Sequence, residues 1–197
     1  MSGTDDGNVP ARLVLLPERS SGDSTLPTQY LKTHRVTGRP NIIIQYRTAS
    51  GINTTAWKEQ FEPDTLIVIV VGDQLAGVQG RVADRWQGTA TEIEQIQSGS
   101  DLTGLAMNCT RHLDALVAKQ GPPVVWFDSL GRTLDHVDID SVVRFLQVCL
   151  GKLEETGATA HFLCQPETVD KTTMTTLRQV FSTVVRIEGD ADWTIEE

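Results

Sequence analysis

Short runs of apolar and β-branched residues alternate with longer amphipathic segments along most of this chain. The run Leu66–Val71 is apolar throughout, which predicts a strand that is buried on both faces. The segment Ile139–Thr156 instead repeats its apolar residues at i, i+3, i+4 and i+7, which is typical of one helix face. Because strands that alternate with helices indicate βαβ units, we expect a predominantly parallel sheet covered by helices on both sides.

The same patterns place the individual elements. The expected strands are Arg12–Leu16, Asn41–Tyr46, Leu66–Val71, Glu92–Gln97 as an edge strand, Val124–Phe127, Ala160–Cys164, Ser182–Glu188, and Asp192–Ile195 as a terminal hairpin partner. The expected helices are Ser24–Val36, Thr54–Phe61, Leu102–Lys119, Ile139–Thr156 and Thr172–Phe181. Asp101 and Asp138 stand where the N-caps of the two long helices belong.

The chain has 197 residues, of which 39% are hydrophobic, so it is long enough for one well-packed domain and short for two. Residues 1–10 are mainly polar and are predicted to be a disordered tail, whereas residues 11–197 are predicted to form the single domain. Residues 72–88 are rich in glycine and are expected to be irregular, as either a binding loop or an ordered insertion.

The formal net charge is −9, from 26 acidic and 17 basic residues, and only 5 of the basic residues are lysines. An acidic, lysine-poor surface suits a high-salt cytoplasm, where ions screen like charges, so we expect a halophilic archaeal origin. The same charge disfavours nonspecific binding to DNA or to anionic lipid. The longest apolar run is too short for a membrane helix and no leader pattern opens the chain, so we expect a cytoplasmic protein.

The stretch Pro17–Thr25 follows the first expected strand and aligns with the P-loop pattern G-x-x-x-x-G-K-[ST]. Gly22 and Ser24 fall on the second glycine and on the hydroxyl position, and Thr25 follows them. Together with the N-terminus of the next expected helix, these groups could still contact an anion. Gly22, Ser24 and Thr25 are therefore candidate cofactor-binding residues.

Two replacements in this stretch remove what the pattern needs for a triphosphate. Pro17 stands at the first glycine and has no N–H. Asp23 stands at the lysine, and a carboxylate there would repel the phosphates that the lysine normally attracts. The sequence therefore predicts a nucleotide-binding frame that retains at most weak binding of ATP and Mg²⁺, and no cofactor is expected.

The run Val124–Phe127 ends in Asp128, as in the Walker B pattern, where an aspartate at the carboxyl end of a buried strand holds Mg²⁺. Asp128 is the fourth candidate binding residue, with capping of a turn as the alternative role. The continuation Asp128–Leu130 and the helix opening Asp101–Leu105 resemble the KaiC-like branch of the RecA-fold P-loop ATPases. The resemblance covers most of the chain and is closest to the short, degenerate KaiC-like proteins of halophilic archaea.

This resemblance implies a three-layer α/β/α sandwich with a RecA-like sheet, an antiparallel C-terminal hairpin, and association through subunit edges. It also implies lost catalysis, because functional KaiC-type ATPases carry paired acidic residues after the second strand, where this chain has Arg47–Ile52 without a carboxylate. Loss of the P-loop lysine and of the acidic residues that activate water should lower the rate of ATP hydrolysis by several orders of magnitude.

We therefore expect no enzyme but a pseudo-ATPase that acts as a regulatory or scaffolding module, in signalling or transcription-related control. Its partner would be another protein or a second copy of the chain. The alternative function is a sensor that binds a nucleotide or another phosphate ligand without hydrolysis. DNA binding is disfavoured by the charge and by the lack of a basic stripe.

The remaining candidate groups favour structural roles. The cysteines have no metal-type spacing and are expected to be reduced and buried; they are Cys109, Cys149 and Cys164. The loop Asp135–Asp140 could hold a metal ion but is expected to be a solvated acidic loop with a helix cap. His161 is expected in the core, His112 has no partner in the sequence, and Arg111 and Arg132 are expected to pair with surface acids. No metal site is predicted.

Overall fold

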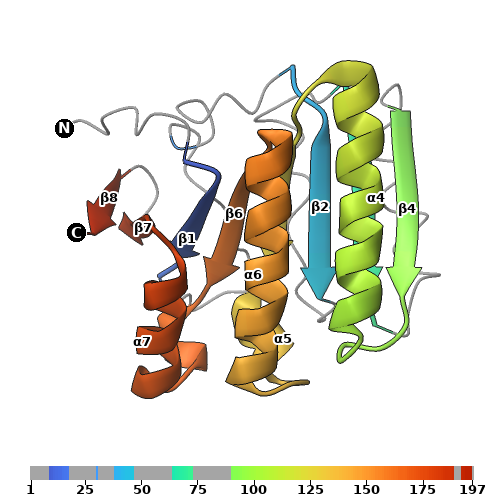
Figure 1. Cartoon of the computed structure of the whole chain (residues 1–197). Helices are drawn as coiled ribbons and strands as arrows, with labels where there is room; N and C mark the ends of the chain where they lie inside the picture. The colour runs from blue at the N-terminus through green and yellow to red at the C-terminus, as the bar shows by residue number, and fades with distance from the viewer. Residues whose placement is uncertain are drawn as a thin grey trace.

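The computed structural model describes residues 9–17, 30, 38–46, 64–72, 90–188 and 192–196. In this part of the chain, eight strands form one sheet (Figure 1). The strands are β1 (Ala11–Leu15), β2 (Asn41–Tyr46), β3 (Thr65–Val71), β4 (Ala90–Ile96), β5 (Val124–Asp128), β6 (Thr159–Cys164), β7 (Val184–Glu188) and β8 (Asp192–Glu196). The expected helices Ser24–Val36 and Thr54–Phe61 and the glycine-rich residues 73–88 lie outside the described residues, except that Tyr30 is helical.

The strand order is β4-β3-β2-β5-β6-β1-β7-β8. Every neighbouring pair is parallel except β7 and β8, which are antiparallel. The consecutive strands β4 and β5 are far apart in this order, because the chain crosses over the sheet between them. The predicted fold class, an α/β protein with a predominantly parallel sheet and an antiparallel C-terminal hairpin, is confirmed.

Pairing between strands moves some of the predicted ends. The last long strand was expected from Ser182 but begins at Val184, which is the first residue of that strand in register with β1. β5 extends one residue further than expected, to Asp128, because this residue is aligned with Gln45 of β2 and Leu163 of β6. Likewise, β4 covers Ala90–Ile96 instead of Glu92–Gln97. These ends depend on neighbouring strands, which a local pattern does not contain.

The described helices are α4 (Leu102–Gln120), α5 (Leu130–Leu134), α6 (Ile139–Thr156) and α7 (Lys171–Val180), with the 3₁₀ helix η1 (Pro166–Thr168) before α7. The predicted caps are confirmed: Asp101 accepts a hydrogen bond from Gly104 N and Asp138 accepts one from Ser141 N, both at 2.8 Å. Asp170 caps α7, so this helix starts one residue before the expected Thr172. The short elements α5 and η1 were not predicted.

Apolar side chains cover both faces of the sheet. On one face, α4, α6 and α7 pack against the strands (Figure 1), and their buried residues include Leu105 and Leu146. On the opposite face, a second core contains Val68, Trp126 and the helical Tyr30. The two-sided burial predicted for Leu66–Val71 is thus confirmed, and it agrees with a sheet that lies between layers of helices.

Candidate functional site

The carboxyl ends of the parallel strands meet at one edge of the sheet, which is where open α/β sheets bind ligands. Leu15, the last residue of β1, is aligned with Cys164 of β6, and Asp128, the last residue of β5, is aligned with Leu163 of β6. β1 and β5 therefore end at nearly the same level, with only β6 between them, about 10 Å apart. Residues that directly follow β1 and β5 therefore start from the same end of the sheet.

Of the four predicted binding residues, the structure places only Asp128. Gly22, Ser24 and Thr25 follow β1 in the sequence but lie outside the described residues, so their distances to Asp128 are not assigned. Pro17, which stands at the first position of the pattern, is described and follows directly from the end of β1. The structure thus brings the two strand ends together, and the predicted binding role of Gly22, Ser24 and Thr25 stays a prediction.

Asp128 has an unusual electrostatic environment for a carboxyl group. Burial raises the pKa of Asp128 to about 6, and the positive charge of Arg132 opposes this shift only in part. Within the described part of the chain, the carboxyl group makes no hydrogen bond, although the residue as a whole is half-buried. The cap of α5 is not Asp128 but Ser129, whose side chain accepts from Arg132 N at 3.4 Å.

A second packed group closes the carboxyl end of β2. The hydroxyl of Tyr46 donates to the carbonyl oxygen of Gly99 at 3.2 Å, and the ring of His136 stacks on Tyr46 with centroids 5.9 Å apart. Burial raises the pKa of Tyr46 to about 12. A Cβ atom on Gly99 would lie 2.5 Å from the His136 ring, so this contact requires glycine. The loop before α4 is therefore fixed against the loop before α6.

The acidic loop Asp135–Asp140 has the structural role that the sequence analysis favoured. Asp135 forms an ion pair with Arg132 at 3.4 Å, and Asp138 caps α6. The ring of His136 stacks on Tyr46. Asp140 is exposed in the first turn of α6, where a negative charge favours the helix dipole.

The predicted burial is confirmed for His161, Cys109 and Cys164, whereas Cys149 is only half-buried. His161 is buried, its Nδ1 lies 2.8 Å from the hydroxyl of Tyr30, and its ring stacks on Trp126. All three cysteines are free, and burial raises the pKa of Cys109 and of Cys164 to about 12. These thiols are therefore neutral and packed in the core near neutral pH, which makes them poor nucleophiles.

A surface groove of about 740 Å³ lies between α4 and α6. Its apolar lining includes Leu102, Ala106, Met107, Val137, Phe145 and Val148. Among the described residues, the most exposed large apolar side chains are those of Met107, at 69%, and Val148, at 59%. Arg111 on α4 and Arg144 on α6 stand on the two walls. The groove is thus an apolar surface bordered by positive charge.

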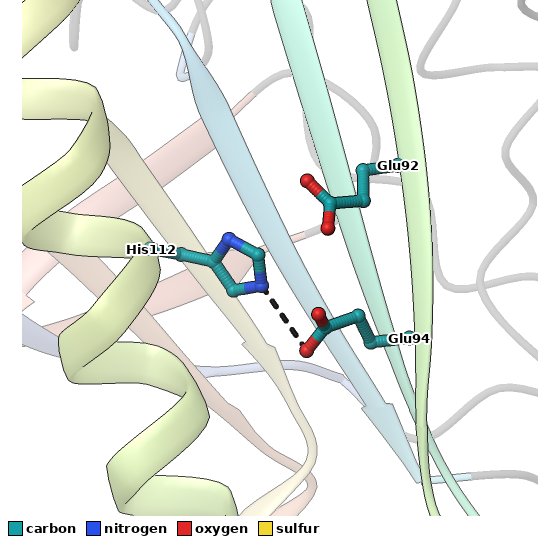
Figure 2. Close-up of side chains that lie close together, drawn as sticks. All are labelled: Glu92, Glu94 and His112. Carbon is teal, nitrogen blue, oxygen red and sulfur yellow. Dashed lines mark ion pairs between the residues drawn. The ribbon is translucent and has the colours of Figure 1, made fainter.

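A cluster of polar residues lies between α4 and β4, which is the outermost strand on one side of the sheet (Figure 2). Glu92 and Glu94 come from β4, and His112 comes from the buried face of α4. His112 Nε2 lies 3.1 Å from Glu94 Oε2, and Arg111 forms an ion pair with the other oxygen of Glu94. Burial alone would raise the pKa of Glu94, but hydrogen bonds from Arg111 and His112 outweigh it and keep this pKa below its ordinary value.

The sequence analysis missed both the groove and the β4–α4 cluster. For the cluster, the signal was present: acidic residues repeat with period two in the expected edge strand, and His112 follows Leu105 and Cys109 on the apolar stripe of α4. For the groove, the signal was weaker, because Met107 and Val148 are single apolar residues outside the buried stripes. Only the packing of α4 beside α6 brings these two residues to one surface.

The sequence was compared with models of known protein families. The family model of DUF7504, described as a family of unknown function, matches residues 5–187. The chain belongs to DUF7504. A comparison with curated proteins gave no match.

Solved structures from archaea resemble the fold of this DUF7504 chain. A protein of Pyrococcus horikoshii OT3, studied as Project ID PH0250, aligns with a TM-score of 0.55 and 11% identity, covering 96% of this chain and 87% of that protein. The flagellar accessory protein FlaH of Methanocaldococcus jannaschii aligns with a TM-score of 0.48 and 10% identity, covering 95% of this chain and 76% of FlaH. At these identities, the first likeness supports the fold alone. Among the described residues of this chain, no helix is long and apolar enough to cross a membrane.

Proposed function

We propose that this DUF7504 chain is a noncatalytic, KaiC-like member of the RecA-like ATPase fold that binds a partner protein as a regulatory or scaffolding module. The groove between α4 and α6 is the observation that carries this proposal. Exposed apolar side chains that gather on one surface can mark a site of protein interaction, and Met107 and Val148 are both exposed in this groove. The acidic, lysine-poor composition supports a halophilic archaeal cytoplasm as its setting.

The lack of catalysis is proposed from the residues at the nucleotide edge. Asp23 would place a negative charge where a lysine should neutralise the phosphates, and Arg47–Ile52 supplies no carboxylate to activate water. Asp128 lies at the Walker B position, but the carboxyl group has a pKa of about 6, which reduces its charge and its hold on Mg²⁺ at mildly acidic pH. These features support a role that does not depend on ATP turnover.

The groove favours one kind of partner, an amphipathic helix whose apolar face is flanked by carboxylates. Two roughly antiparallel or parallel helices, such as α4 and α6, form a channel into which a third helix can insert its apolar residues. Arg144 stands on one wall and Arg111, which also pairs with Glu94, stands on the other, so acidic residues beside the inserted face would meet positive charge. A partner with basic flanks would be repelled.

A binding experiment with two synthetic helical peptides tests this proposal. Both peptides carry the same leucine stripe, but one has glutamate flanks and the other has lysine flanks. We expect the full chain to bind the glutamate peptide, as measured by fluorescence anisotropy in 0.1 M KCl, where charges are only partly screened, and to bind the lysine peptide at least about tenfold more weakly. Met107→Glu and Val148→Glu should abolish binding of the glutamate peptide.

Ala115→Glu and Gln147→Glu are the matched controls, because both residues are exposed on α4 and α6 but do not line the groove. Equal binding of the two peptides, or equal loss in the controls, would contradict a charge-bordered docking groove. Light scattering of the chain alone adds a further check: self-association that Met107→Glu removes would identify a second copy as the occupant. ATP hydrolysis that Asp128→Asn abolishes would overturn the noncatalytic function itself.

The second candidate function, a sensor of phosphate ligands, is favoured by the alignment of the β1 and β5 ends at one edge of the sheet. Isothermal titration with ATP and ADP, with and without Mg²⁺, distinguishes it from scaffolding. A sensor should bind one of them with micromolar affinity and lose this affinity in Ser24→Ala. A flat titration would leave scaffolding as the only function of the two.

A further inference from the structure

Three side chains with metal-ligating chemistry converge between β4 and α4. Glu92 and Glu94 are two residues apart on β4 and so point to the same face of the sheet. They are in register with Ile67 and Ile69 of β3, which belong to the core under the helical layer. Figure 2 shows both carboxylates directed toward α4 and the ring of His112 directed toward β4.

The distances suit a common ion. One ligand atom from each of the three residues lies within 4.8 Å of the others. Zinc–ligand bonds of about 2.0–2.2 Å in a tetrahedral arrangement place neighbouring ligand atoms about 3.3–3.5 Å apart. His112 Nε2 and Glu94 Oε2, at 3.1 Å, are already close to this separation. Of the three ligands, Glu92 has to move most, and it is exposed and can change its rotamer.

The charges in the cluster leave room for a cation. Two carboxylates face one guanidinium, that of Arg111, and Glu92 forms no ion pair with the described residues. Arg111 contacts Oε1 of Glu94 and His112 contacts Oε2, and the same guanidinium nitrogen of Arg111 also lies 3.3 Å from His112 Nε2. The side chain of Arg111 is 58% exposed. It can therefore turn into solvent, away from His112 Nε2, when this nitrogen and Oε2 bind a metal.

We propose that Glu92, Glu94 and His112 bind a divalent transition-metal ion of the Zn²⁺ class. One imidazole nitrogen and two carboxylate oxygens suit such an ion better than Ca²⁺ or Mg²⁺, which take oxygen ligands. Three protein ligands leave one tetrahedral position open to water or to another ligand. The bound ion would connect the edge strand β4 to α4. This proposal does not depend on the proposed function.

Titration of the chelator-treated full chain with Zn²⁺ tests the site. We expect saturable one-to-one binding by isothermal titration calorimetry. Glu92→Gln should weaken this binding at least about tenfold, because it removes a ligand from an exposed position that the fold does not need. Glu188→Gln, at an exposed glutamate on β7, is the matched control and should bind like the unmodified chain. His112→Gln, checked for folding by circular dichroism, should also weaken binding.

Substitution with Co²⁺ gives a second readout. The proposed ligands predict the visible absorption bands of tetrahedral Co²⁺ without a thiolate charge-transfer band. A thiolate band would place the metal on a cysteine and overturn the proposal. Absence of saturable Zn²⁺ binding, or binding that Glu92→Gln and His112→Gln leave unchanged, would overturn it as well.

Discussion

At the scale of single residues, the same chemical group behaves differently according to its neighbours. Asp128 is desolvated at the end of β5, so its pKa rises to about 6. Glu94 is also partly buried, but Arg111 and His112 donate hydrogen bonds to it and its pKa falls below the ordinary value. Asp128 is thus a group whose ionisation opposes folding, whereas the ionisation of Glu94 favours folding.

Asp128 should make stability depend on pH in a defined window. The pKa of Asp128 in the folded chain is raised above its unfolded value. The free energy of unfolding is therefore highest below about pH 4, where the carboxyl group is protonated in both states, and it falls as the pH rises through about 6. We expect Asp128→Asn to increase the free energy of unfolding above pH 6, by up to about 3 kcal/mol for a shift of two pKa units. Urea denaturation at pH 5 and at pH 7.5 measures this gain.

The control for this prediction is Asp135→Asn, which removes an exposed carboxylate at the same edge of the sheet. Because exposed ion pairs contribute little, this variant should change stability by less than about 1 kcal/mol at either pH. An Asp128→Asn variant that is no more stable than the parent above pH 6 would mean that a favourable contact of the ionised carboxylate compensates its burial.

At the scale of secondary-structure elements, α6 shows how local sequence sets a helix and its end. Asp138 caps its first turn, and Gly157 ends it in the left-handed conformation, with φ of 65°. Between them, the apolar stripe packs against the sheet. Gly151 lies inside the same helix, is exposed, and has nothing within 4 Å of the position of a Cβ atom. The backbone conformation at position 157 therefore favours glycine, whereas position 151 can accept a side chain.

This contrast predicts opposite effects of one substitution. Gly151→Ala should stabilise the chain by about 0.5–1 kcal/mol, because alanine favours the helix interior and has fewer unfolded conformations than glycine. Gly157→Ala should destabilise it by about 1 kcal/mol, because a Cβ atom disfavours the left-handed conformation. Urea denaturation of the two variants beside the parent measures both changes. A loss of stability in Gly151→Ala would show that the helix interior tolerates no side chain there.

At the scale of the whole molecule, excess negative charge opposes compaction, and ion pairs between distant elements offset part of it. Glu196 of β8 forms ion pairs with both Arg178 of α7 and Arg186 of β7, which ties the C-terminal hairpin to the helical layer. Lys152 of α6 pairs with Asp114 of α4 at 2.7 Å. Such ion pairs do not change the net charge of −9, so the acidic residues in excess still repel one another.

We therefore expect salt to stabilise the whole chain. Raising KCl from 0.1 to 1 M should screen the repulsion and increase the melting temperature at pH 7.5 by at least about 3 °C, corresponding to about 1 kcal/mol for a domain of this size. The increase should be much smaller near pH 4.9, the isoelectric point of the sequence, where the net charge vanishes. Scanning calorimetry measures both melting temperatures. An equal increase at the two pH values would show that salt acts by exclusion from the protein surface and not by screening of charge.

The sequence by itself determined the elements that depend on local chemistry. The strand Asn41–Tyr46 and the helix Ile139–Thr156 were predicted with their observed bounds, and Asp101 and Asp138 were identified as caps, because periodicity and capping act within a few residues of the chain. The carboxyl end of a buried strand also located Asp128. The parallel sheet followed from the alternation of these elements.

Only the tertiary structure decided which distant residues share a surface. Glu94 meets His112 because β4 pairs at the edge of the sheet and α4 crosses back over it, and Met107 and Val148 border one groove because α4 and α6 lie side by side. The raised pKa of Asp128 depends likewise on the burial that neighbouring strands and loops impose. Contacts and desolvation of this kind arise from packing between segments far apart in the chain, which no local pattern encodes.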